Sequence, residues 1–272
     1  MTKKGSKEVI RINLIRENRY VGGDMLDIDI FTVKKTGKTR KSKAKPTSEI
    51  QERLNRKSSE KKLRRTIHLN FRAGRDWELH LTFSSEFLPK SDDDHKREIQ
   101  NFMRRVKRLY KKHGEEKTLK YIIVLGGRDG MSRRHAHITI TGTDKFGRSD
   151  LEALWKLGTA NADRLQDRDD RMFSPLSHYV GGTKQFIRSD DVRGKKSWWG
   201  SRNLEKPKAD QRTGHLSQRA VRELIFTDEL DCEAVEKIYP GYRVVEYEVT
   251  EPDIFGQIYI NVLMKRRRND RR

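Results

Sequence analysis

The sequence predicts an α+β fold built on a mainly antiparallel sheet. Three patterns support it: an alternating strand, an amphipathic helix and a two-stranded hairpin, which follow one another over residues 77–83, 99–110 and 120–141. Further helix and strand patterns come after the hairpin. Strands and helices in this mixed order are typical of an α+β domain.

The first strand is the segment WELHLTF. Its alternation places Leu79, Leu81 and Phe83 on one face and His80 and Thr82 on the other, as in a strand that is buried on one side.

The helix begins after the sequence PKSDDD, which is a helix-start signal, and ends at Gly114. Its apolar residues have the spacing of one helical face, and the opposite face is mostly Lys and Arg. The apolar face comprises Ile99, Phe102, Met103, Val106, Leu109 and Tyr110.

The hairpin consists of KYIIVL (Lys120–Leu125), the turn GGRDGMS and the returning strand RHAHITIT (Arg134–Thr141). Beyond it we expect a capped helix over 149–157, a strand over 160–165, a helix from Ser174 and two strands near the end of the chain. These last strands are expected at Tyr242–Val249 and Gln257–Met264.

Composition indicates a polyanionic partner. Lys and Arg total 61 against 40 Asp and Glu, which gives a net charge of +21 over 272 residues. Such a positive field attracts nucleic acid. Charge does not separate an enzyme from a binding protein, and a solvated basic surface is the simpler alternative.

Several classes of protein are disfavoured. The single cysteine, Cys232, allows no internal disulfide and no cysteine-based zinc site. No apolar run approaches a membrane span, and the N-terminus leads into no signal core, so we expect a cytoplasmic protein of a bacterial host. The chain has no Gly-x-x-x-x-Gly-Lys-Ser/Thr loop, so a helicase and a polymerase must come from the host or the genetic element.

Three regions are expected along the chain. Residues 1–60 form a basic arm, residues 61–210 the catalytic domain, and residues 211–272 an extension whose two strands pack on the same domain. The stretch VKKTGKTRKSKAK within the arm has almost no large apolar residue. Such a segment is typically unfolded until it meets a polyanion.

His135 and His137 are the centre of the functional argument. Two residues apart on a strand, they project from one face, while Ala136, Ile138 and Ile140 project from the other. Two adjacent imidazoles make half of a metal site. The simpler alternative is a pair of unrelated surface histidines.

Two residues are candidates for a third metal ligand. Asp129 lies in the hairpin turn, a few residues before His135, although turn aspartates commonly serve turn geometry. His80 lies on the polar face of a strand that can neighbour the histidine strand, as a ligand or a residue supporting one. A polar residue on an open sheet face is the simpler interpretation of His80.

Tyr179 is the candidate nucleophile, because a tyrosine can attack a DNA phosphodiester directly. It precedes Gly181 and Gly182, which allow close approach of a DNA backbone, and Lys184, which can neutralise charge. A core aromatic on an amphipathic helix is the simpler interpretation.

Nucleic-acid contacts are expected from four residues. Adjacent tryptophans among Lys and Arg, in KKSWWGSRNLEKP, suit base stacking on single-stranded DNA, although one of them can instead pack on the core. The candidates are Arg133, Arg134, Trp198 and Arg202.

Together these segments resemble the HUH endonucleases, the rolling-circle replication initiator (Rep) proteins of small plasmids and single-stranded DNA phages. The resemblance rests on the LT-rich strand LHLTF, the His-x-His strand at 135–137, and a tyrosine followed by a lysine at Tyr179 and Lys184. It runs from about residue 36 to residue 264.

The resemblance implies a central antiparallel sheet of about five strands with helices packed on one face. The open face then holds Mg²⁺ or Mn²⁺ and single-stranded origin DNA. It implies nicking through a 5′-phosphotyrosine. The sequence departs from the family at Gly126 or Gly127, where a ligating glutamate is usual, and at Lys184, which lies five residues after the tyrosine rather than three or four.

These departures keep two other interpretations open. One is a non-catalytic DNA-binding protein on the same fold, for which the missing glutamate is the signature. The other is a relaxase or transposase relative, since both share the histidine pair and the tyrosine.

Overall fold

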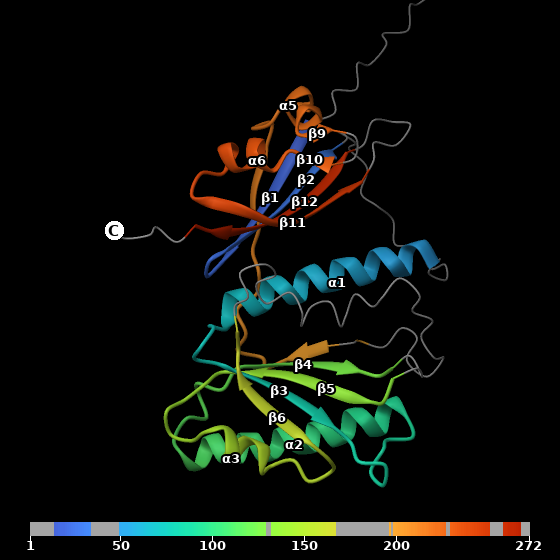
Figure 1. Cartoon of the computed structure of the whole chain (residues 1–272), viewed down its shortest axis with the longest axis vertical. Helices are drawn as coiled ribbons and strands as arrows, with labels where there is room; N and C mark the ends of the chain where they lie inside the picture. Colours follow the sequence, from blue (N-terminus) through green and yellow to red (C-terminus); the bar gives the residue numbers. More distant parts are fainter. Residues whose placement is uncertain are drawn as a thin grey trace, which may run out of the picture. The chain divides into compact units, whose positions relative to one another are not determined.

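The computed structural model describes residues 14–33, 49–128, 132–166, 196, 198–226, 229–250 and 258–267. The chain divides into two compact units. Unit 1 contains Met1–Pro46 and Lys208–Arg272, and unit 2 contains Thr47–Pro207. Each unit has its own five-stranded antiparallel sheet (Figure 1), so the α+β class expected from the sequence is confirmed. No helix of the described ranges is long and apolar enough to cross a membrane.

Unit 2 carries the segments on which the functional argument rests. Its strand order is β6-β3-β5-β4-β7. In chain order, the elements of this unit are α1 (Glu49–Asn70), β3 (Trp77–Thr82), α2 (Asp92–Lys112), β4 (Tyr121–Gly126), β5 (His135–Ile140), α3 (Arg148–Glu152), β6 (Ala160–Arg164) and β7 (Trp198–Gly200).

Helix α2 forms where the amphipathic pattern predicted it. The Ser91 side chain accepts a hydrogen bond from the backbone N–H of Asp94 and caps the first turn. The apolar face of α2 packs with α3 against the alternating apolar residues of β3 and β5 in one buried cluster. Each large side chain buried in this way contributes roughly 1.5–3 kcal/mol. The cluster includes Leu79, Leu81, Ile99, Phe102, Met103, Val106, Tyr110, Ala136, Ile138 and Ile140.

The expectation that helices cover only one face of the sheet is wrong. Helix α1 lies on the other face (Figure 1), where Leu63, Ile67 and Phe71 pack with Ile122 and Val124 of β4. The charged composition of α1 concealed this role, because its apolar residues are few and are concentrated in its last turns. The histidine face is therefore covered over β4 and only partly open.

Unit 1 corrects the expected basic arm. Residues 14–33 form a hairpin, and the C-terminal strands pair with it rather than with the histidine sheet; the strand order is β11-β12-β2-β1-β8. The elements of this unit are β1 (Leu14–Gly22), β2 (Met25–Val33), β8 (Asp210–Thr213), α5 (Gln218–Glu223), β9 (Ile225–Phe226), β10 (Glu229–Leu230), α6 (Cys232–Ile238), β11 (Tyr242–Thr250) and β12 (Tyr259–Arg266).

The physical reason for the hairpin is visible in the sequence of β2. Leu26, Ile28 and Ile30 alternate along the strand and are buried in the core of unit 1. Gly23 adopts a φ of 57° in the tight turn between β1 and β2, a conformation that glycine enters without steric cost. The high overall charge of residues 1–60 masked this short alternating run.

A buried ion pair ties α2 to the end of the β4–β5 hairpin. The Asp92 carboxylate accepts hydrogen bonds from Arg128 Nε at 2.6 Å and from Arg128 Nη2 at 2.8 Å. Both residues are almost fully buried, at 2% and 5% exposure. Arg134, at the start of the returning strand, lies 3.7 Å from the same carboxylate. The N-terminus of α2 thus anchors both ends of the turn that precedes His135.

Replacing Asp92 by Ala should lower the free energy of unfolding of unit 2 by about 3–5 kcal/mol, because it leaves the Arg128 charge buried without its carboxylate. Urea unfolding followed by tryptophan fluorescence measures this effect. All four tryptophans of the chain lie in unit 2, so the signal is specific to that unit. The control Asp93→Ala, at an exposed position of the same turn, should cost less than about 1 kcal/mol. Equal losses in the two variants would contradict the role of the pair.

Candidate metal centre

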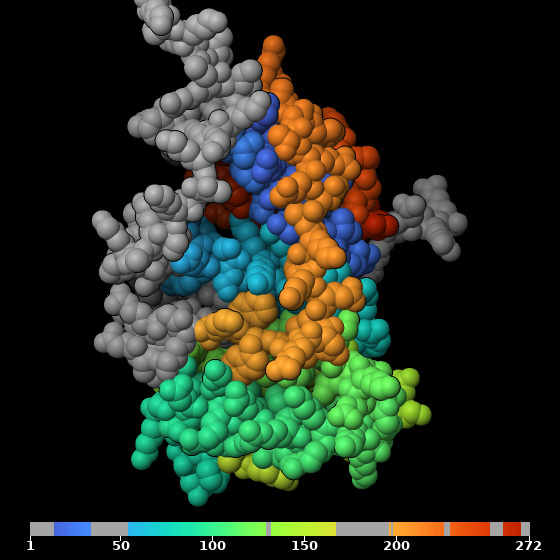
Figure 2. Space-filling view, turned by 180° about the vertical axis from the view of Figure 1, so that it is seen from behind, coloured from blue at the N-terminus to red at the C-terminus, as the bar shows by residue number. Residues whose placement is uncertain are grey.

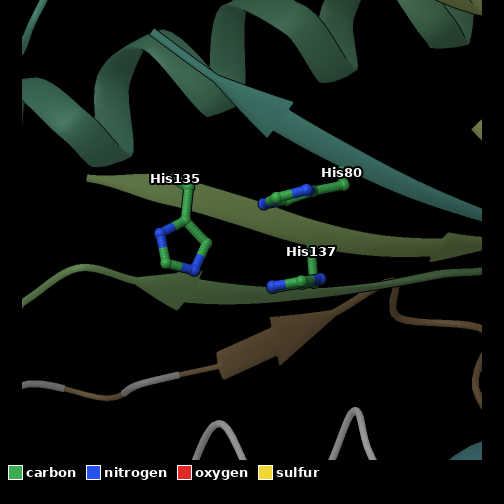
Figure 3. A group of neighbouring side chains, drawn as sticks. All are labelled: His80, His135 and His137. Atoms are coloured by element: carbon green, nitrogen blue, oxygen red, sulfur yellow. The ribbon is translucent and has the colours of Figure 1, made fainter. Parts of the chain in front are cut away.

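Three histidines meet on the face of the unit 2 sheet that is opposite α2. His80 of β3 lies directly across from His137 of β5, and His135 lies across from Thr82, one pair further along. One nitrogen from each of the three rings lies within 4.8 Å of one from each of the others. Figure 3 shows the rings converging from the two neighbouring strands.

The ring arrangement is compact. His80 and His137 stack with centroids 4.6 Å apart and an interplanar angle of 7°. The His135 ring lies edge-on to both, at 5.3 Å from His80 and 5.2 Å from His137. Side chains that cross between strands in directly opposed positions are held at this range by the sheet itself.

Burial keeps His80 and His137 in their neutral form. Desolvation, followed by the proximity of His80 and His135, lowers the pKa of His137 to about 3. Desolvation and then the proximity of His135 also lower the pKa of His80. A neutral imidazole is the form that coordinates a metal ion, so the cluster is prepared for ligation at neutral pH.

The orientation of His135 is set by its own strand and by a glycine. Its Nδ1 lies 2.8 Å from the carbonyl oxygen of Arg133, so this N–H donates and Nε2 carries the lone pair. The ring lies over Gly126, its partner in β4. A Cβ at Gly126 would come within 2.1 Å of His135 Nε2. The glycine that replaces the family's usual glutamate therefore makes room for the ring.

A carboxylate lies near the cluster. Glu78 Oε1, on the same strand and face as His80, is 3.9 Å from Nδ1 of His137. Carboxylates in this position commonly orient the histidine ligands of metal ions. Within the described residues, the acidic group nearest to the histidines is thus beside the cluster rather than in the hairpin turn.

The other expected site residues have different outcomes. The Arg133 side chain donates to Ser85 Oγ at 2.7 Å, and Arg202 is exposed. Trp198 is partly buried on the cluster of α1 and β4, and its indole N–H donates to Ser59 Oγ at 2.9 Å. Their contacts with DNA stay predictions. Asp129, Tyr179 and Lys184 lie outside the described residues.

Trp199 projects to the opposite face of β7 and packs on the core of α2, with Lys96 Nζ 5.8 Å from its ring centroid. The two tryptophans therefore attach the edge strand β7 to the two cores of unit 2. This arrangement favours the structural alternative for both residues over a free stacking platform.

His80 is the residue that the sequence underestimated. Its place on the polar face of a strand was evident, but the pairing of that strand with the histidine strand was not. One signal was present: the sequence LHLTF has the same polar-face spacing as HAHIT, and register brings the two together. A single sequence carries no direct information on register.

The comparisons with known proteins support a role in replication. Residues 76–184 match the model of a family of replication-associated proteins, the ORF2 family. The matched range spans β3, α2, β4, β5, α3 and β6, and includes all three histidines together with Tyr179 and Lys184. No curated protein and no solved structure gives a significant match. The match identifies a replication-initiator-like protein with a role in the initiation of replication.

Replacing Gly126 by Ala should displace the His135 ring and separate it from His80 and His137, because the added methyl group occupies the position of Nε2. NMR spectra of the histidine side chains measure this through changes in the three cluster resonances. The control is Gly147→Ala, where a Cβ meets nothing within 4 Å. Unchanged cluster resonances in Gly126→Ala would show that His135 does not lie over this glycine.

Proposed function

We propose that this protein is a metal-dependent DNA endonuclease that starts rolling-circle replication by cutting one strand with Tyr179. The observation that carries the proposal is the three-histidine cluster on a sheet face within the region that matches a replication-associated family. The composition supports a nucleic-acid substrate through its net charge of +21.

The donor set fits a divalent metal ion. Three neutral imidazoles leave coordination positions open for water and for phosphate oxygens. Mg²⁺ prefers oxygen ligands, whereas imidazole binds transition metals well, so of Mg²⁺ and Mn²⁺ we favour Mn²⁺. His80, His135 and His137 would hold the ion, and Asp129 remains a further candidate from the turn. The bound ion would supply charge withdrawal from the scissile phosphate.

The chemistry of the proposed cleavage belongs to Tyr179. Its phenolic oxygen attacks phosphorus, the bond from phosphorus to the 3′ oxygen breaks, and the 3′ oxygen takes up a proton. The products are a 5′-phosphotyrosine and a free 3′-hydroxyl that can prime synthesis. Lys184 neutralises charge near the phenolate or the phosphate. A later attack by a 3′-hydroxyl reverses the step and joins the strand.

Chain length allows Tyr179 to reach the histidines. The nearest described residues on either side, Gln166 and Lys196, follow β6 and precede β7, which are the two edges of the sheet. Tyr179 is 13 residues from the first and 17 from the second (179 − 166 and 196 − 179). An extended chain covers roughly 3.3 Å per residue, so both distances exceed the width of a five-stranded sheet, about 20 Å.

The cluster also weakens the argument for a non-catalytic protein. That argument rested on the missing glutamate, and His80 supplies a third donor in its place. A degenerate nickase would have no need of three converging neutral imidazoles. The non-catalytic interpretation and the relaxase or transposase relative are therefore kept as outcomes of the tests.

Replacing His80, His135 or His137 singly by Ala should lower Mn²⁺-dependent nicking by on the order of 100-fold or more, because each removes one of three ligands. Affinity for DNA should change little, since phosphate contacts dominate it. Calorimetric titration with Mn²⁺ gives a second measurement that does not depend on cleavage. The control is His113→Ala, a histidine of unit 2 outside the cluster. Wild-type Mn²⁺ affinity in His80→Ala would remove His80 from the ligand set.

Replacing Tyr179 by Phe should abolish the covalent protein–DNA adduct and leave DNA binding unchanged, because only the attacking oxygen is lost. A denaturing gel of protein mixed with labelled single-stranded origin DNA and Mn²⁺ measures the adduct. Tyr121→Phe is the control, because Tyr121 lies in β4 and packs against the core. An adduct that persists in Tyr179→Phe would move the nucleophile to another residue. No adduct with the wild-type protein on verified origin DNA would favour the non-catalytic interpretation.

A further inference from the structure

Helix α2 carries a basic surface that the proposed cleavage does not use. From Ile99 to Lys112 the helix contains six cations and no acidic residue. Five of the cations are exposed and form what we call the α2 ridge. The ridge comprises Arg104, Lys107, Arg108, Lys111 and Lys112.

The ridge occupies one side of the helix. At 100° per residue its members fall within an arc of about 140°, opposite the buried apolar face. From Arg104 to Lys112 it extends along the axis for about 12 Å, at a rise of 1.5 Å per residue. Figure 2 shows part of the molecular surface that the segment around α2 forms, coloured teal to green.

The ridge cations have no carboxylate partners among the described residues. Arg104 donates to the amide oxygen of Asn101 at 2.8 Å, and Lys107 Nζ lies 5.5 Å from the ring centroid of Tyr121. By contrast, Arg97 near the start of the same helix pairs with Asp94 at 2.8 Å. Acidic side chains on α2 thus serve its first turns and leave the ridge uncompensated.

Like charges this close are unfavourable in the absence of a ligand. Arg104 is followed by cations three and four residues later, as are Lys107 and Arg108, and each such pair destabilises a helix by about 0.2–0.5 kcal/mol. A polyanion laid along the ridge converts this repulsion into binding. The helix remains stable meanwhile because its apolar face is buried in the core.

The ridge lies on the side of the sheet away from the histidines. The residues of β5 that pack against α2 are Ala136, Ile138 and Ile140, which alternate with the histidines and point to the opposite face. DNA bound to the ridge is therefore a different stretch from the strand at the proposed cleavage site.

We propose that the α2 ridge binds the phosphate backbone of double-stranded DNA. The ridge is a convex row of cations, and its exposed positions include no aromatic side chain. Single-stranded DNA is usually held by stacking of its bases on aromatic residues as well as by charge. A straight row of Lys and Arg without such residues suits a duplex, whose phosphates are regularly spaced and whose bases are stacked internally.

The test compares two variants with the same loss of charge. The ridge variant is Arg104→Gln, Lys107→Gln, Arg108→Gln, Lys111→Gln and Lys112→Gln. The matched control neutralises five exposed cations that are scattered over both units: Lys145→Gln, Lys156→Gln, Lys206→Gln, Arg222→Gln and Lys237→Gln. Each variant reduces the net charge from +21 to +16 (21 − 5).

Fluorescence anisotropy with a labelled duplex of arbitrary sequence gives the affinity at a series of salt concentrations. Log affinity falls with log salt with a slope of about −0.9 per phosphate contact, so losing most of the ridge contacts should flatten the slope by about 3. Duplex affinity at low salt should fall by on the order of tenfold or more. The scattered control should keep a slope close to that of the wild-type protein.

Three results would overturn the proposal: an equal loss in the ridge variant and the scattered control, no loss in the ridge variant, or an equal loss for a short single-stranded oligonucleotide. Circular dichroism establishes that the ridge variant is folded. The ridge variant should also match the wild-type protein in cutting a short single-stranded oligonucleotide. Because duplex binding is measured without metal or cleavage, failure of the proposed nicking function leaves this test readable.

Discussion

The antiparallel register of β3 and β5 is the constraint on which the candidate metal centre depends. It places His80 opposite His137, and it places Leu79 opposite Ile138 in the core beneath α2. A slip of one residue would turn His80 into the core and a leucine toward the other two imidazoles. The burial of the apolar face against α2 therefore fixes the histidine face as well. The hydrophobic core of unit 2 and its cluster of imidazoles form as one event, and neither can be rearranged without the other.

The same arrangement determines the electrostatics of the site. His137 is buried and its pKa is lowered to about 3, so it is neutral near pH 7. An ion held by neutral imidazoles would keep its full double positive charge, whereas carboxylate ligands would cancel part of it. For a reaction at a negatively charged phosphate, that remaining charge is useful both for attraction and for charge withdrawal. The exchange of a usual glutamate for Gly126 is consistent with this: the position that lost a carboxylate gained room for a ring.

Local patterns in the sequence predicted the elements of unit 2 well, because each depends on neighbours along the chain. The alternation at Trp77–Thr82 and the apolar stripe of α2 are short-range signals, and the structure confirms both. The partnership of His80 with His137 and the pairing of β2 with β12 join residues far apart in sequence, and no local pattern encodes them. Residues 14–33 show a second limit: averaged over a basic stretch, the charge hid an alternating strand that supplies Ile28 and Ile30 to a core.

Charge and chemistry are separated in this protein. The strong positive charge of the chain includes the uncompensated row on α2, whereas the histidine cluster lies apart from that row. An initiator needs both properties: it must remain on DNA while one phosphate is exchanged, and general attraction must not block the reacting strand from the site. Placing the cations of α2 on one side of the sheet and the imidazoles on the other satisfies both needs. Because β5 alternates between the two faces, a single strand links the two surfaces, and α2, anchored through Asp92 to the hairpin, supports both.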